Sequence, residues 1–377
     1  MKTLYLLTLA LALPLAAEVL TPTDEIPADE SSQQQVSLHV AQHLNIPDAI
    51  GRAGMGAVGL NRADDGRRAV IFFGGANFPN AKPGAKTPEE RGAKVFYDTI
   101  GSVSYSASGQ MKDAPARLPY PVAYAAVGAH GSDIFIAGGC NADGHLSKAL
   151  LLNPDTLQTT ALPELPVTCG YPAYTVLGDD LYIIGGQEKP DSTAALKRVF
   201  KLNMADPQKG WQELAPMPDD GRQLAVAGTA NGKIYVTGGC SLHPDANGKA
   251  ERTYLKTTLV YDPAANTWST AADAPETLVG AATPMPFVEG GLYLIGGDPG
   301  EYYRASLKGQ APEEHPGQSR FIYRLDPATG AWAKAGELPL GVATLPSATD
   351  GSIILTISGE THPGVRTPKI FHISINK

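Results

Sequence analysis

The sequence has 377 residues, and its 41 glycines and 31 prolines make up about 19% of the chain, where roughly 12% is average. Hydrophobic residues account for 43%, which is ordinary for a folded protein and excludes a disordered or collagen-like chain. Charged residues account for only 18%, which argues against long solvated helices and coiled coils. An all-β chain of short strands and frequent turns fits this composition best.

The N-terminus has the pattern of a secretory signal peptide. Lys2 precedes an apolar stretch from Leu4 to Leu15, and the small residues Ala16 and Ala17 follow it. A membrane anchor is the alternative, but this stretch is shorter than the roughly 20 apolar residues that span a bilayer. We therefore expect residues 1–17 to be removed on export and residues 18–377 to form a single periplasmic or secreted domain.

The net charge limits the kinds of partner. The formal charge is −8, and it becomes about −9 once the segment that contains Lys2 is removed. An acidic surface repels phosphate backbones and anionic lipids. We expect no nucleic-acid partner and no membrane insertion after the signal is cleaved.

The three cysteines, Cys140, Cys169 and Cys240, allow at most one internal disulfide. A chain of this length buries enough surface to fold without a covalent cross-link. Three small buried thiols are therefore expected, although the sequence leaves open whether any two of them pair.

An apolar strand that ends in two glycines recurs along the chain at intervals of 47 to 64 residues. Five copies are complete, and the sixth has Ser358 in place of the first glycine. The copies are AVIFFGG (69–75), DIFIAGG (133–139), DLYIIGG (180–186), KIYVTGG (233–239), GLYLIGG (291–297) and SIILTISG (352–359). Such self-similarity is typical of repeat folds in which each unit is one small sheet.

Aromatic residues mark a later strand of the repeat. Tyr261 precedes Trp268, Tyr323 precedes Trp332 and Phe200 precedes Trp211, so all three tryptophans occupy one repeat position. We expect these side chains to pack between neighbouring sheets. The doublet glycines are expected at the crowded inner end of each sheet, where a Cβ would clash or a positive φ is needed.

The two ends of the chain complement each other. After the sixth doublet only one further strand remains, TPKIFHISI, so the last sheet lacks its outer strand. Residues 34–48, QQVSLHVAQHLNIPD, have the pattern of an outer strand. We expect the N-terminal segment to pair with the last sheet, which removes two free edges.

These features resemble the kelch repeat, whose units are the blades of a β-propeller. Six doublet positions then imply a single-domain, six-bladed, all-β propeller closed by an N-terminal strand.

Two loops resemble a more specific family, the sialic acid mutarotases, or N-acetylneuraminate epimerases, of the bacterial cell envelope. The loops are GGANFPN (74–80) and SGETHPGVRT (358–367). In that family an acid and an arginine in a G-E-x-x-P-G-x-R-T pattern are the proposed catalytic pair, and here Gly359, Glu360, Pro363, Gly364, Arg366 and Thr367 carry it. The order of the two loops is that of the cyclically permuted branch.

The resemblance implies an isomerase that interconverts the α and β anomers of free sialic acid. Mutarotation requires proton transfer at the anomeric hydroxyl and at the ring oxygen, and it needs no cofactor or metal. Glu360 is the expected acid or base, and Arg366 is expected to hold the sugar carboxylate. The alternative for this pair is a surface salt bridge that pins the turn.

Four further residues are candidates for substrate binding by their position: Asn77, Arg222, Tyr124 and Tyr174. The two tyrosines are assigned comparable places in PVAYAAV and YPAYTVL, with core packing as their alternative. Inserts at 78–94 and 298–318 are expected to cover the channel mouth. The first carries Lys82, Lys86, Arg91 and Lys94, which would favour an anionic sugar unless this loop is merely solvated.

Other functions were weighed against this one. A non-catalytic propeller that binds a carbohydrate or a protein is the main alternative, because the fold alone fixes no activity. The sequence has no H-E-x-x-H, P-loop or G-x-S-x-G motif. A pair of glycosidase carboxylates stays open, since distance in space cannot be read from spacing in the chain.

Overall fold

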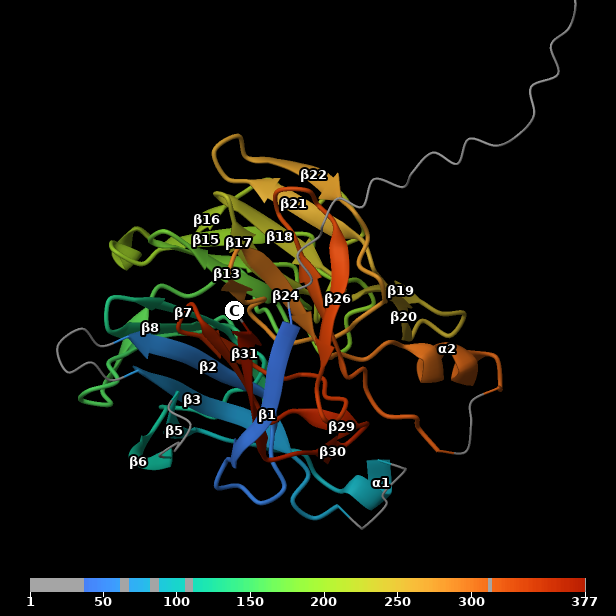
Figure 1. Ribbon diagram of the computed structural model, residues 1–377, viewed down its shortest axis with the longest axis horizontal. Coiled ribbons are helices and arrows are strands. Elements are labelled where there is room, and N and C mark those ends of the chain that lie inside the picture. The colour runs from blue at the N-terminus through green and yellow to red at the C-terminus, as the bar shows by residue number, and fades with distance from the viewer. Residues whose placement is uncertain (1–36, 62–67, 82–87, 106–110, 311–313, 377) are drawn as a thin grey trace, which may run out of the picture. The chain divides into compact units, whose positions relative to one another are not determined.

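Six β-sheets surround a common centre in the computed structural model (Figure 1), which describes residues 37–61, 68–81, 88–105, 111–310 and 314–376. Val36–Lys377 forms one compact unit. The predicted signal peptide and the domain start at residue 18 lie outside the described residues. Within the described ranges, no helix is long and apolar enough to cross a membrane.

Each sheet has four antiparallel strands in its main path, and we call the sheets blades A to F in chain order. From the inside outward, blade A contains β2 (Ala53–Asn61), β3 (Arg68–Asn77), β5 (Thr99–Ser104) and β6 (Met111–Arg117). Blade B contains β7 (Ala126–His130), β8 (Asp133–Ala137), β11 (Ala149–Leu152) and β12 (Thr159–Leu162). Blade C contains β13 (Ala173–Leu177), β14 (Asp180–Ile184), β15 (Val199–Asn203) and β16 (Gln212–Glu213). Blade D contains β17 (Val226–Ala230), β18 (Lys233–Thr237), β21 (Thr258–Asp262) and β22 (Thr267–Ala271). Blade E contains β23 (Phe287–Val288), β24 (Gly291–Ile295), β25 (Phe321–Leu325) and β26 (Trp332–Glu337). Blade F contains β27 (Ser347–Thr349), β28 (Ile353–Ile357), β31 (Lys369–Asn376) and β1 (Ser37–Asn45). The predicted six-bladed propeller is confirmed.

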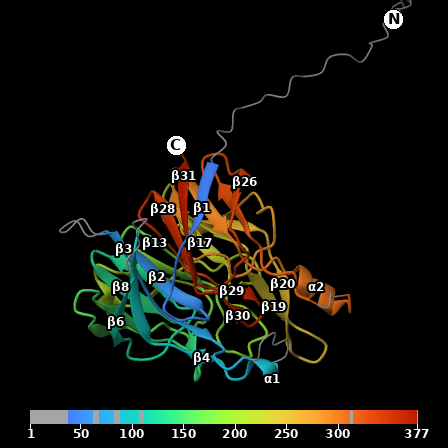
Figure 2. The same cartoon turned by 60° about the horizontal axis from the view of Figure 1, so that its bottom comes forward.

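Short elements follow the doublets, and several of them lie on one side of the ring, as Figures 1 and 2 show for the β19–β20 and β29–β30 hairpins and for α1 and α2. These short elements are β4 (Val95–Phe96), which pairs with β3, the helices α1 (Pro88–Arg91) and α2 (Glu301–Leu307), and the hairpins β9–β10 (Cys140–Asn141, Gly144–His145), β19–β20 (Cys240–Pro244, Ala250–Tyr254) and β29–β30 (Glu360–His362, Val365–Arg366). The 3-10 turn η1 (Pro207–Lys209) lies elsewhere, between β15 and β16.

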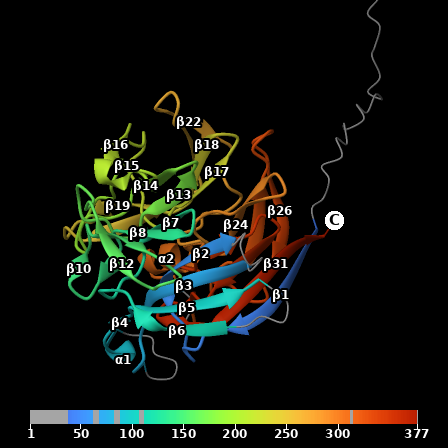
Figure 3. The same cartoon turned by 90° about the vertical axis from the view of Figure 1, so that its left-hand side faces the viewer.

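The ring closes through its last blade, as predicted. Strand β1 pairs with β31 in antiparallel register from Ser37 opposite Asn376 to Asn45 opposite Lys369, with one irregularity between Gln42 and Leu44. Figure 2 shows the two strands side by side, and Figure 3 shows blade A with β2, β3, β5 and β6 in succession. Blade F therefore contains strands from both ends of the chain.

The glycine doublets join neighbouring blades. The first glycine of each complete doublet has a φ between 62° and 67°, and a Cβ there would lie 2.2–2.6 Å from a carbonyl oxygen of the next blade. The second residue of each doublet donates its N–H to a carbonyl of the next blade over 2.8–2.9 Å. These bonds run from Gly75 to Val122, Gly139 to Cys169, Gly186 to Arg222, Gly239 to Leu278, Gly297 to Val342 and Gly359 to Arg52. The predicted need for glycine at this position is confirmed.

The core lies between the blades. The buried apolar residues form five clusters, and each cluster contains side chains from adjacent sheets. Each tryptophan packs at the edge of a cluster and donates its indole N–H to a carbonyl of the preceding blade: Trp211 to Pro163, Trp268 to Ala215 and Trp332 to Ala272. The predicted packing of these residues between sheets is confirmed.

The cysteines are free and buried, and none of them pairs with another. Burial raises the pKa of the Cys169 thiol to about 12 and that of Cys240 to about 11. Both groups therefore stay protonated and unreactive at neutral pH. Three small buried thiols were the more favoured prediction, and it holds.

Deletion of residues 1–48 removes β1 and exposes the edge of β31, so we expect the melting temperature to fall sharply. Thermal unfolding followed by circular dichroism measures this, with a truncation that ends before Ser37 as the control. An unchanged melting curve after the longer deletion would contradict closure by β1.

The doublet positions can be tested with a matched pair of glycines. Gly238 has a φ of 67° and a prospective Cβ contact of 2.4 Å, whereas Gly232 has a φ of 72° and nothing within 4 Å. Both alanine substitutions carry the cost of a left-handed backbone, about 1–2 kcal/mol. Gly238→Ala should destabilise the protein by a further ~1–3 kcal/mol in urea unfolding, because it also crowds the next blade. Equal losses would mean that the contact between blades is unimportant.

Candidate functional site

A small ring of backbone closes the centre of the propeller. Six residues, one from each blade, adopt a φ between 53° and 64°: Gly54, Tyr124, Tyr171, Leu224, Gly280 and Thr344. Five N–H to carbonyl bonds of 2.5–2.9 Å link neighbours in this ring. They run from Gly54 to Thr344, Tyr124 to Gly54, Leu224 to Tyr171, Gly280 to Leu224 and Thr344 to Gly280.

A cavity of about 450 Å³ lies against this ring, within the usual size range of small-molecule sites. Four of the six ring residues line it, together with side chains from the doublet exits and from the inserts. Its charged and amide-bearing lining residues are Lys94, Gln187, Gln223, Arg252, Asp298, Gln318, Glu360 and Arg366. The cavity is therefore polar and contains both predicted catalytic residues.

Glu360 and Arg366 face each other across the β29–β30 hairpin. They are register partners, and the Arg366 guanidinium forms an ion pair with the Glu360 carboxylate. The Arg366 side chain is only 4% exposed, while that of Glu360 is 19% exposed. Burial is the main cause that lowers the pKa of Arg366, yet an arginine in this range stays charged. The structure thus contains the salt bridge that was the alternative for this pair, and places it on the wall of the cavity.

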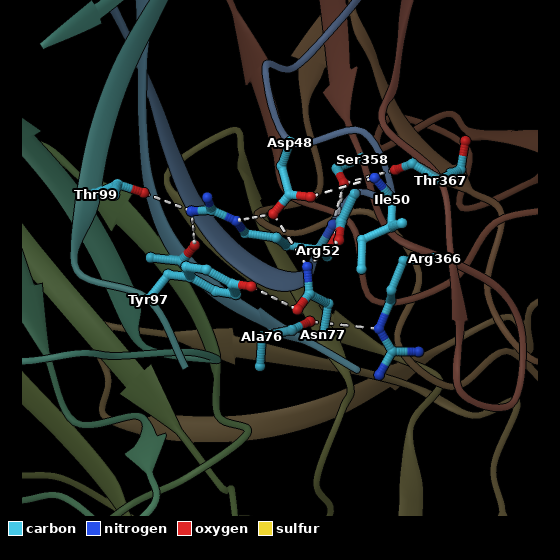
Figure 4. Close-up of polar contacts among 12 residues, drawn as sticks. Asp48, Ile50, Arg52, Ala76, Asn77, Tyr97, Thr99, Ser358, Arg366 and Thr367 are labelled. Atoms are coloured by element: carbon cyan, nitrogen blue, oxygen red, sulfur yellow. Dashed lines mark hydrogen bonds and ion pairs between the residues drawn. The ribbon is translucent and has the colours of Figure 1, made fainter. Parts of the chain in front are cut away.

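Ser358 anchors this hairpin to blade A. Its φ of 57° is close to that of the doublet glycines. Its hydroxyl accepts the Arg52 N–H over 2.7 Å and lies 2.7 Å from the Thr367 carbonyl and 2.8 Å from the Arg52 carbonyl. Figure 4 shows these contacts beside Arg366, whose Nε–H points to the Ala76 carbonyl at 3.4 Å. The serine hydroxyl therefore contacts the same carbonyl that accepts the bond between blades F and A.

Asn77 is fully buried and does not line the cavity. Its amide donates to Asp48 over 3.0 Å and to the Gly51 carbonyl over 2.9 Å, and its oxygen accepts the Tyr97 hydroxyl over 2.8 Å. In Figure 4 the side chain points into this network. Both of its donor hydrogens are used within the protein, so Asn77 supports the start of the first insert and has no donor left for a sugar.

Arg222 is likewise buried, with 1% of its side chain exposed, and lies outside the cavity lining. It is paired with Asp219, donates to the Gly238 carbonyl over 3.1 Å, and binds both oxygens of Thr257 at 3.0–3.1 Å. These contacts tie the entry of blade D to its doublet.

The same arrangement recurs in blade A, which identifies it as part of the fold. Arg52 donates to Asp48 over 2.9 Å and to the Gly74 carbonyl over 3.2 Å. The segments DAIGR (48–52) and DDGR (219–222) share this aspartate, glycine and arginine.

The two candidate tyrosines are not equivalent, which corrects the comparison made from sequence. Tyr124 belongs to the central ring and lines the cavity, and its true counterpart is Tyr171, whose ring centroid is 4.6 Å away. Tyr174 lies three residues further on, in β13, with its side chain buried and its hydroxyl donating to the Thr283 carbonyl over 3.3 Å. Tyr174 lines a water-sized cavity of about 30 Å³ and is absent from the lining of the cavity that contains Glu360.

One side of the cavity was not among the predicted site residues. Asp298 accepts the Tyr254 hydroxyl over 2.6 Å and the Gly300 N–H over 2.8 Å, and exposed Arg252 extends from the same hairpin as Tyr254. Burial, followed by the charge of Asp298, raises the pKa of Tyr254, so its hydroxyl remains a donor. The β19–β20 hairpin that carries Arg252 follows the doublet of blade D, but it has no counterpart of similar sequence in the other blades and was not predicted.

Both predicted inserts reach the cavity. Lys94 comes from the first insert, and Asp298 and Gln318 begin and end the second. Lys82 and Lys86 lie outside the described residues. These three residues line the cavity, and the prediction that the inserts cover the channel mouth stays a prediction.

Comparisons with known proteins agree with the predicted resemblance. The family model described as "NANM: N-acetylneuraminate epimerase" matches residues 162–318. The resemblance to N-acetylneuraminate epimerases is confirmed. The N-acetylneuraminate epimerase of Haemophilus influenzae (strain PittEE) is 26% identical over 226 residues, 54% of this chain and 57% of that protein. The N-acetylneuraminate epimerase of Yersinia enterocolitica is 29% identical over 258 residues, 60% of this chain and 62% of that protein.

The chain thus spans about three fifths of the length of these N-acetylneuraminate epimerases. The family match includes Arg222 and Tyr174 but ends before Glu360 and Arg366. A solved structure titled "Structure of YjhT" superposes with a TM-score of 0.64 at 16% identity, covering 88% of this chain and 99% of that one, which supports the fold. The cyclic permutation stays a prediction.

Two arginines of blade D are expected to differ in role, because Arg222 supports the fold whereas Arg252 lines the cavity. Arg222→Met leaves Asp219 without its partner beside a buried cluster, so it should lower the free energy of unfolding by about 3–5 kcal/mol. Arg252→Met removes an exposed charge and should change it by less than about 1 kcal/mol. Urea unfolding measures both, and equal effects would argue against a structural role for Arg222.

Proposed function

We propose that this protein is a mutarotase that speeds the interconversion of the α and β anomers of free N-acetylneuraminate or a close relative. The observation that carries the proposal is the Glu360 carboxylate, held by Arg366 on the wall of a cavity of about 450 Å³. The relatives named N-acetylneuraminate epimerase support the same substrate class.

The reaction needs one proton removed and one supplied. Glu360, directly or through water, takes the proton of the anomeric hydroxyl, while a proton is delivered to the ring oxygen. The bond between the anomeric carbon and the ring oxygen then breaks, and the open-chain ketone forms. Rotation about the neighbouring carbon–carbon bond presents the other face of the ketone. Ring closure returns both protons, so no atom is gained or lost.

Arg366 has two effects on Glu360 in this proposal. Its charge favours the ionised carboxylate, which is the form that accepts a proton. The paired geometry also fixes the carboxylate across the hairpin, so that less conformational freedom is lost on the way to the transition state. A low-exposure arginine is suited to both tasks because it stays charged.

The charge state of Glu360 also argues against a glycosidase. A glycosidase needs one carboxylic acid that is protonated before the reaction, which a carboxylate paired with arginine disfavours. Asp298, the neighbouring acid in the cavity, already accepts two hydrogen bonds within the protein. A non-catalytic sugar-binding propeller remains the competing function and is separated from a mutarotase by kinetics.

Glu360→Gln keeps the shape of the side chain but removes its basicity. We expect the acceleration of mutarotation to fall at least ~100-fold, the usual scale of a general-base contribution. Proton NMR of freshly dissolved N-acetylneuraminate follows the approach to anomeric equilibrium, and a melting curve checks that the variant is folded. A wild-type protein that binds the sugar without changing the rate would establish the binding-propeller alternative.

Arg366→Lys keeps the charge but loses the planar fork. We expect kcat to fall about tenfold with the fold intact, because a point charge orients Glu360 less well. Unaltered kinetics in the same NMR assay would argue against the positioning role of Arg366.

A further inference from the structure

Lys94 contributes a positive charge to the cavity without an acidic partner. Its ammonium lies 5.2 Å from the ring centroid of Tyr124 and 5.0 Å from that of Phe96. Among the described residues, no carboxylate oxygen lies within 4 Å of it, while several other lysines of the chain form ion pairs. An aromatic cradle holds a cation in place and leaves its hydrogen-bond donors available.

Each of the two arginines of the cavity is influenced by an acid of the same cavity, but only Arg366 forms an ion pair among the described residues. Arg366 is paired with Glu360 and is almost wholly buried. Binding a second carboxylate at Arg366 would compete with Glu360 for the same guanidinium. Arg252 lies beside Asp298, whose negative charge acts on it. Lys94 can therefore bind an anion without breaking an ion pair among the described residues.

The charge of the cavity fits an anionic ligand. Three cations and two carboxylates line it, which leaves one positive charge in a protein whose formal charge is −8. A local charge of opposite sign to the rest of the protein is typical of a site that attracts a charged ligand.

The position of Lys94 relative to Glu360 suits one class of sugar. In a 2-keto sugar acid the carboxylate and the anomeric hydroxyl are bonded to the same carbon. The group that binds the carboxylate must then lie next to the group that takes the hydroxyl proton. Lys94 and Glu360 line the same cavity, and so does Tyr124, whose ring supports Lys94.

We propose that Lys94 binds the carboxylate of the sugar and makes the cavity selective for 2-keto sugar acids over neutral sugars. This inference rests on the proposed function for its substrate class. It assigns the carboxylate to Lys94 and leaves Arg366 to position Glu360.

The test compares N-acetylneuraminate with its methyl ester, which lacks the negative charge. Isothermal titration calorimetry gives the ratio of the two Kd values, and NMR gives the two mutarotation rates. For the wild type we expect the acid to bind about tenfold more tightly than the ester. Lys94→Met should reduce that ratio to about twofold or less and raise KM for the acid much more than it lowers kcat. Lys94→Arg should retain most of the preference.

Lys148→Met is the matched control, because the Lys148 ammonium also lies 5.0 Å from a tyrosine ring, that of Tyr120, but outside this cavity. It should leave the wild-type ratio in place. Melting curves of all variants exclude unfolding as the cause of a change.

A full preference for the acid in Lys94→Met would overturn the inference, whether or not the protein is a mutarotase. Equal wild-type affinity for the acid and the ester, or no binding of either, would also overturn it. If the wild type binds the acid selectively, loses this in Lys94→Met, and never accelerates mutarotation, the inference stands and the proposed reaction fails.

Discussion

The hydrogen bond from the second residue of each doublet to a carbonyl of the next blade is the constraint on which this propeller depends. It occurs at all six junctions, including that from Gly359 to Arg52. For the two backbones to come this close, the preceding residue must have a positive φ and a small side chain. Glycine meets both conditions at the lowest cost in free energy. The strands are thereby brought to the axis, and the chain that leaves each doublet is directed to the same side of the ring. The cavity forms where those exits meet.

The segments that leave the doublets explain why the candidate site residues lie at this side of the ring. The residue after each doublet forms a backbone bridge or strand pair with the inner strand entry, so its position is fixed by the fold while its side chain is free to vary. Across the six blades this position is Ala76, Cys140, Gln187, Cys240, Asp298 and Glu360. The backbone of an acid at such a place is held by the fold, and at Glu360 the ion pair with Arg366 also orients the carboxylate. Rigid placement is what a proton-transfer group requires.

The repeat and the ring closure could be predicted from sequence because each rests on a local requirement. A glycine doublet after an apolar strand has a backbone reason at every copy, and a missing outer strand at one end matches a spare strand at the other. The Glu360 and Arg366 pair could be found for the same reason, since both lie in one short hairpin. Asn77 and Arg222 were harder, because a buried polar side chain and a ligand-binding one look alike in sequence.

The spacing of the repeat would have shown that Tyr174 is not the counterpart of Tyr124. Tyr124, Tyr171, Leu224 and Thr344 each precede the first doublet position of their blade by 14 residues, and Tyr174 does not share that spacing. Asp298 could also have been found, since it follows its doublet as Glu360 does. Arg252 could not, because the β19–β20 hairpin has no counterpart of similar sequence. The Arg252 backbone N–H donates to the Tyr303 hydroxyl, and the Tyr303 ring contacts that of Tyr254; no periodicity encodes these contacts.

The pairing of β1 with β31 in blade F determines when the site forms during folding. Glu360 lies between β28 and β31, and β31 is held by β1, so the acid is positioned only when the first and last strands have met. A chain still under synthesis can form blades A to E but has no complete site until its final twenty or so residues are present. The onset of the proposed mutarotation in a refolding or translation experiment would then report the final step of assembly.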